Sequence, residues 1–246
     1  MSVISSFRAA VAFFTRLPVG KAPLPPTLSG IVAWLPAVGL LVGALAGLAL
    51  LLAARLGLTA LPCGVLAALA WTAVTGGLHL DGVADCGDGL LVEAPPERRL
   101  AIMKDSRLGS FGALALFFVL STKVAALAAL VGTAPLHALC ACCLAGMLGR
   151  CQVFAGMRLP TARPGGLGSM MHDGMKPRYA YTALGLCLVA CLAMGRHGLY
   201  SLLAAVLTGI WLLSAARARI GGVTGDVFGA LIETTECAVL LACCLP

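Results

Sequence analysis

Apolar runs of about 20 residues recur along this sequence, and they constrain its fold more than any other feature. The hydrocarbon core of a bilayer is about 30 Å thick, so an α-helix needs about 20 apolar residues to cross it. With 60% hydrophobic and 11% charged residues, the chain of 246 residues has the composition of a protein dissolved in lipid. Because the runs are long and do not alternate, they predict helices and not barrel strands. We therefore expect an all-α, polytopic integral membrane bundle.

Seven segments are predicted to be transmembrane helices. They cover residues 31–54, 61–78, 111–131, 135–156, 179–194, 199–216 and 227–245. Residues 1–17 carry Arg8 and Arg16 among apolar side chains, which predicts an interfacial amphipathic helix. The sequence contains no internal repeat and no separable soluble domain, so we expect a single domain over residues 1–246, with the lipid bilayer as its surroundings.

The lysines and arginines alternate between the connections of these segments. The sequence has 17 lysines and arginines. Two of them, Arg55 and Arg196, lie in connections on one side of the membrane, and Lys123 lies within a span. The other fourteen lie in connections on the opposite side: Arg8, Arg16, Lys21, Arg98, Arg99, Lys104, Arg107, Arg150, Arg158, Arg163, Lys176, Arg178, Arg217 and Arg219. Because cytoplasmic loops carry the excess of Lys and Arg, we expect a cytoplasmic N-terminus and an external C-terminus in the cell inner membrane. The long polar loops 81–110 and 157–178 then share the cytoplasmic face, where we expect the active site.

The net charge of +7 follows from these loops and the lipid headgroups that they face. It therefore does not predict nucleic-acid binding. The sequence is compatible with a homo-oligomer.

The stretch TGGLHLDGVADCGDGL, residues 75–90, places three aspartates at the end of an apolar segment. Asp81, Asp85 and Asp88 are spaced i, i+4 and i+7, which puts them within about 60° on one helical face. Carboxylates this close repel one another unless a cation lies between them, and oxygen ligands suit Mg²⁺ or Mn²⁺. The spacing thus predicts a divalent metal site, and the alternative is a solvated acidic turn. The preceding His79 is either part of this site or a packing residue.

The following stretch, RRLAIMKDSRLGSFG, contributes Lys104, Asp105 and Arg107 just before a glycine-flanked entry into the next span. Cations and glycine amides beside a divalent metal suit the binding of a diphosphate. The alternative is that the basic residues only hold the loop at the headgroups.

A last set of acidic residues lies in the stretch GGVTGDVFGALIETTE, residues 221–236. Asp226, Glu233 and Glu236 fall within about 80° on one helical face, two of them at hydrocarbon depth. Ionisable groups at that depth are costly, so a functional role is the default hypothesis. The alternative is an ion pair with Lys123, and we expect Lys123 to pair with Glu236.

These blocks, in this order, resemble the cobalamin synthase family, the adenosylcobinamide-GDP ribazoletransferases. The resemblance covers nearly the whole chain and rests on FFTRLPVG, WLPAVGLLVG, TGGLHLDGVADCGDGL, RLAIMKDSRLGSFGALAL and GGVTGDVFGA, with HxDGxxDxxDG as the most specific motif. It implies a Mg²⁺-dependent enzyme that joins α-ribazole, or its phosphate, to adenosylcobinamide-GDP and releases GMP.

The resemblance also implies roles for the candidate residues. Asp81 and Asp85 are metal ligands, and Asp88 is a ligand or the catalytic base, with His79 beside it as a catalytic candidate. The substrate-binding candidates are Lys104, Asp105, Arg107, Asp226 and Glu233. Two alternative functions are a CDP-alcohol-type phosphotransferase, whose motif has an arginine where Asp85 stands, and a membrane transporter.

Overall fold

The computed structural model describes residues 2–20, 28–163, 165–173 and 176–246, and at residues 29, 167 and 172 the backbone alone. All the regular elements in this part of the chain are helices, and a single parallel bridge joins Thr161 to Val223. The prediction of an all-α fold is therefore confirmed. Lys21 of the predicted basic set lies outside the described residues.

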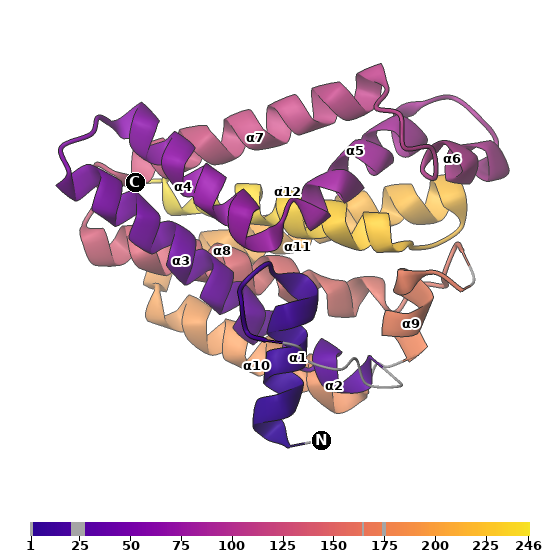
Figure 1. Cartoon of the computed structure of the whole chain (residues 1–246), viewed down its shortest axis with the longest axis horizontal. Helices are drawn as coiled ribbons and strands as arrows, with labels where there is room; N and C mark the ends of the chain where they lie inside the picture. The colour runs from indigo at the N-terminus through magenta and orange to yellow at the C-terminus, as the bar shows by residue number, and fades with distance from the viewer. Residues whose placement is uncertain (1, 21–27, 164, 174–175) are drawn as a thin grey trace.

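Most of the long helices run along the long axis of the molecule, and α1 runs across it (Figure 1). In chain order the helices are α1 (Val3–Phe14), α2 (Ser29–Val32), α3 (Leu35–Arg55), α4 (Ala60–Thr75), α5 (Leu78–Leu91), α6 (Pro96–Ile102), α7 (Ser110–Leu130), α8 (Pro135–Gly156), α9 (Leu167–Asp173), α10 (Pro177–Ala193), α11 (Gly195–Ile220) and α12 (Gly225–Cys243). The crosswise direction of α1 suits the predicted interfacial helix.

Four of the described helices, α3, α7, α8 and α11, are long and apolar enough to cross a membrane, and the pair α4 and α5 makes a fifth if it is one bent span. All seven predicted segments coincide with helices, but the count of seven spans is not confirmed. The helix α10 has only 17 residues, and α12 carries three acidic residues. Most of α12 is buried against α5, α8 and α11, so its acidic groups are enclosed by protein.

The helices α4 and α5 meet at an angle of 95°. Gly76 and Gly77 form this bend with φ values of 65° and 72°, a left-handed conformation that glycine adopts without steric cost. Residues 81–91 were predicted to begin a polar loop, and they instead continue as helix α5, packed against α12 and α7. The bend therefore redirects the chain, and the acidic face of α5 carries an exposed Asp81 and half-buried Asp85 and Asp88.

Close backbone contacts hold the bundle together. An ideal Cβ atom on Gly43 of α3 would lie 2.1 Å from the carbonyl oxygen of Cys142 in α8. Such an approach excludes every larger residue, and small residues at four-residue spacing commonly form such contacts in membranes.

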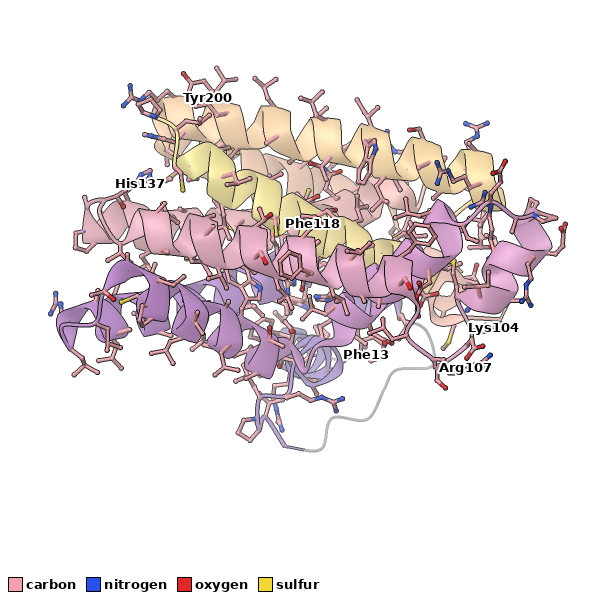
Figure 2. All side chains as sticks on the ribbon, turned by 90° about the horizontal axis from the view of Figure 1, so that it is seen from above. Phe13, Lys104, Arg107, Phe118, His137 and Tyr200 are labelled. Carbon is pink, nitrogen blue, oxygen red and sulfur yellow. The ribbon has the colours of Figure 1, made fainter. Side chains whose placement is uncertain are left out.

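The polar connections separate to the two ends of the molecule. Lys104 and Arg107 lie at one end, and His137 and Tyr200 lie at the other (Figure 2). His137 stacks edge-on against His197 with ring centroids 4.5 Å apart, which joins the start of α8 to the start of α11. This separation agrees with the predicted alternation of loops, except that Arg150, counted there with a cytoplasmic loop, is buried inside the bundle.

Candidate active site

The acidic face of α5 opens into a cavity of about 280 Å³, which we call the carboxylate cavity. Its wall contains six of the candidate residues: Asp81, Asp85, Asp88, Lys104, Asp105 and Arg107. The aspartates come from α5, and the other three come from the connection between α6 and α7. The structure therefore brings together the two sequence blocks from which a metal and diphosphate site was predicted.

Asp226 approaches this acidic face from α12. An ideal Cβ on Gly82 would lie 2.5 Å from the carbonyl oxygen of Asp226, so only glycine permits this crossing of α5 and α12. Asp85 consequently feels repulsion from both Asp226 and Asp81 and attraction from the guanidinium of Arg163. Carboxylates from two helices thus face a shared region.

Asp88 has partners that the sequence did not predict. Its two carboxylate oxygens accept hydrogen bonds from the backbone N–H groups of Gly109 (2.7 Å) and Gly112 (2.8 Å). These N–H groups lie at the start of α7, where backbone donors have no partner within the helix. Asp88 therefore anchors the N-terminus of α7 to α5, and its predicted role as metal ligand or base stays a prediction.

The basic loop presents its charges to solvent. The Arg107 guanidinium is paired with Asp105 at 2.6 Å, and its side chain is 87% exposed. Hydrogen bonds from Arg107 lower the pKa of Asp105 to about 2, so Asp105 is ionised at neutral pH and orients Arg107. Lys104 is also exposed, and no ion pair within the described part of the chain engages its ammonium group. The loop can therefore turn two cations toward an anionic ligand.

A second cavity, of about 260 Å³, shares Asp81 with the first. We call it the apolar cavity after the buried apolar side chains in its wall: Phe14, Leu35, Val153, Met171, Phe228 and Ile232. His79, Arg163, Thr224 and Asp226 contribute polar groups to the same wall. The two cavities thus flank Asp81 on α5.

His79 and Arg163, two residues of this wall, each have a buried polar atom without a partner among the described residues. The His79 side chain is 4% exposed, and its Nδ1 atom has no hydrogen-bond partner among the described residues. The same holds for Nε of Arg163, although another nitrogen of its guanidinium donates to the carbonyl oxygen of Leu100 at 3.1 Å. Buried polar atoms without a partner are costly, and a bound ligand is one way to satisfy them.

Glu233 lies away from both cavities, in a buried network of charges. Lys123 forms ion pairs with Glu233 (2.5 Å) and with Glu236 (2.6 Å), and Arg150 pairs with Glu236 at 2.7 Å. The expected pair of Lys123 and Glu236 is confirmed. Substrate binding by Glu233 stays a prediction that this geometry does not favour, because its carboxylate is engaged and only 2% exposed.

The same network bears on the transporter alternative. Two cations and two anions neutralise one another there. Mutual pairing of this kind favours a structural role over an ion pathway.

Within the described residues, no group of three or more His, Cys, Asp or Glu side chains is arranged to hold a metal ion by itself. Asp81 and Asp85 nevertheless line one cavity, and their carboxylates form no hydrogen bond or ion pair with described residues. Mg²⁺ is commonly bound by one or two carboxylates, with water and substrate phosphates as the remaining ligands. The donor set of the carboxylate cavity therefore fits Mg²⁺ in the presence of a phosphate ligand.

Comparison with known proteins identifies the family. The model of the cobalamin-5-phosphate synthase family matches residues 6–244. The chain belongs to this family. Three similar proteins, each named adenosylcobinamide-GDP ribazoletransferase, come from Pseudomonas paraeruginosa, Bradyrhizobium diazoefficiens and Citrobacter koseri.

The identities are 40% over 249 residues for the first, 38% over 247 for the second and 41% over 249 for the third. The alignments cover 98%, 98% and 96% of this chain, and 98%, 93% and 98% of the relatives. No solved structure matches the chain. As a member of the cobalamin-5-phosphate synthase family, it is a transferase of cobalamin biosynthesis, and the predicted family is confirmed.

Sequence reasoning did not single out two parts of this family member's candidate site. Arg163 was one of several polar residues in a loop rich in glycine and proline, and nothing in its neighbours indicates that it faces Asp226 at 3.7 Å. Phe14 was assigned to an interfacial helix, yet it lies 4% exposed in the wall of the apolar cavity. The FFTRLP block was the available signal for Phe14.

Proposed function

We propose that this protein joins α-ribazole, or α-ribazole phosphate, to adenosylcobinamide-GDP and releases GMP. The observation that carries the proposal is the carboxylate cavity, whose wall contains free carboxylates of α5 together with Lys104 and Arg107 of the connecting loop. Relatives about 40% identical over nearly the whole chain are named for this reaction, which supports the same substrates here.

In this reaction a ribose hydroxyl attacks the phosphorus that is attached to the corrinoid side chain. The new O–P bond forms as the bond to the bridging oxygen of the diphosphate breaks, and GMP leaves with that oxygen. A bound Mg²⁺ would neutralise charge on the diphosphate and on the departing GMP. Lys104 and Arg107 bind the diphosphate by charge-assisted hydrogen bonds.

Asp81 and Asp85 are the groups best suited to hold Mg²⁺ or to take the hydroxyl proton. Their oxygens are not engaged by described residues, whereas both oxygens of Asp88 already accept amide hydrogen bonds. The proton of the attacking hydroxyl would pass to one of these free carboxylates.

We further propose that the carboxylate cavity faces the cytoplasm in the cell inner membrane. The connection that carries Lys104 and Arg107 lies at the end opposite to His137 and Tyr200 (Figure 2). Cytoplasmic loops carry the excess of basic residues, which supports this orientation.

The experiment uses the full-length protein in lipid vesicles with adenosylcobinamide-GDP, α-ribazole and Mg²⁺, and follows GMP. We expect one GMP for each condensed corrinoid product, and no GMP when α-ribazole is omitted or when EDTA replaces Mg²⁺. Release of GDP, or GMP release that does not depend on the nucleoside, would contradict the proposed reaction. Undiminished turnover in EDTA would contradict the role of Mg²⁺.

A further inference from the structure

The two cavities that meet at Asp81 differ in chemistry, and the reaction proposed above has two substrates. The carboxylate cavity offers carboxylates and exposed cations, which suit a metal-bound diphosphate. The apolar cavity offers buried aromatic and aliphatic side chains, together with His79, Thr224 and the paired charges of Arg163 and Asp226. Such a wall suits a diphosphate less well, because the oxygens need donors or cations when they leave water and the Arg163 guanidinium already faces Asp226.

Five of the apolar side chains in this wall come from four separate elements. Phe14 comes from α1, Leu35 from α3, Met171 from α9, and Phe228 and Ile232 come from α12. All five side chains are at most 4% exposed in the folded chain, so they are closely packed and present a small part of their surface to the cavity. Two aromatic rings in such a wall favour a planar, apolar heterocycle.

Polar groups stand where the rest of a nucleoside would lie. His79 and Arg163 line this cavity, and Nδ1 of His79 and Nε of Arg163 are buried without a partner among the described residues. They can bond ribose hydroxyls or, in the case of the Arg163 guanidinium, a phosphate. Asp81 borders both cavities, which places a ligand in one beside a ligand in the other.

We infer that the apolar cavity binds the acceptor nucleoside, with its base against Phe14 and Phe228 and its ribose toward His79 and Asp81. This inference rests on the proposed function. It assigns the diphosphate of the corrinoid substrate to the carboxylate cavity and separates the two substrates by the chemistry of their sites. Phe14, Phe228 and Ile232 then select for a planar apolar base.

A larger residue at Gly166 would fill part of the apolar cavity, which allows a test of this inference. Gly166 lines the apolar cavity, and an ideal Cβ there would lie at least 3.8 Å from the described atoms around it, so the described backbone does not block a side chain. Gly185 on α10 is the matched control, because its Cβ would meet nothing within 4 Å among the described residues and it lines neither cavity. We compare Gly166→Leu with Gly185→Leu in vesicles and measure KM for each substrate.

Gly166→Leu should raise KM for α-ribazole by about tenfold or more, since a filled pocket rejects its ligand, and should change KM for adenosylcobinamide-GDP by less than about twofold. Gly185→Leu should change neither value. A rise in KM for adenosylcobinamide-GDP alone, or no change in either KM, would overturn the assignment. Absence of turnover in the wild type would instead contradict the proposed function, so the two failures are distinguishable.

An inhibition experiment on the wild type does not depend on the folding of a variant. Free benzimidazole, a probe for a planar apolar base, should inhibit competitively with respect to α-ribazole and not with respect to adenosylcobinamide-GDP. Competition with adenosylcobinamide-GDP, or no inhibition at saturating benzimidazole, would overturn the inference.

Discussion

Lys123 lies in the middle of an apolar helix, and its surroundings explain why the bundle tolerates it. Its side chain is 2% exposed, its ammonium group contacts two carboxylates, and it lies 4.8 Å from the centre of the Trp71 ring. Glu236 in turn accepts a hydrogen bond from Arg150. Removing one member of such a network leaves the others uncompensated in a medium of low dielectric constant.

A double-mutant cycle tests this coupling. Lys123→Met and Glu236→Gln should each lower the free energy of unfolding by about 3–5 kcal/mol, because each leaves a buried charge without its partner. The double variant should lose less than the sum of the two. The free energies are measured by unfolding in mixed detergent micelles, with Lys123→Met combined with Glu93→Gln as the control, since Glu93 is exposed. Strict additivity for Lys123 and Glu236 would mean that they do not interact.

At the scale of the helices, α5 positions the site, and the sequence predicted only part of its geometry. The spacing of Asp81, Asp85 and Asp88 predicted a shared face, because a helical period is local information. The predicted span 61–78 ran through Gly76 and Gly77, so the sequence did not predict the angle of 95° there. The direction of α5 depends on its contacts with α12 and α7, which lie far away in the sequence.

The contact of Asp88 with the start of α7 predicts a loss of stability. Asp88→Ala leaves the N–H groups of Gly109 and Gly112 without their acceptor, which should lower the free energy of unfolding by about 1–2 kcal/mol. Glu93→Ala is the control, and both variants are measured by unfolding in the same micelles. Equal stability of Asp88→Ala and the wild type would show that the contact contributes nothing. Lost turnover in a variant that is still folded would support the predicted catalytic role of Asp88.

At the scale of the whole molecule, the chain separates its polar groups between the two ends of an apolar bundle. The sequence predicted this separation well, because the positions of lysine and arginine along the chain record the alternation of the loops. The sequence predicts seven spans, and that count is not confirmed, because α10 is short and α12 carries three acidic residues. It also placed Arg150 in a loop, since pairing with Glu236 has no local signal.

The apolar cavity shows the limit of such prediction most clearly. Its wall joins α1, α3, α9 and α12, so no single stretch of sequence contains its pattern. The carboxylate cavity was more predictable, because only two neighbouring blocks of the chain supply its candidate residues. A site built from neighbouring segments can be predicted from one sequence. A site built from helices that are distant in the sequence can be recognised only in the folded structure.

The central claim is that the free carboxylates of α5 serve the transfer reaction, and the rate of GMP release from adenosylcobinamide-GDP tests it most directly. The rate is measured with α-ribazole and Mg²⁺ for the wild type, Asp81→Asn, Asp85→Asn and the exposed control Glu93→Gln. Each aspartate variant should lose at least about 100-fold in rate while remaining folded, because an amide replaces an ionic oxygen without changing the shape of the side chain. Glu93→Gln should keep the wild-type rate. Near-normal GMP release by both folded aspartate variants would contradict the claim and reduce the acidic face of α5 to a structural feature.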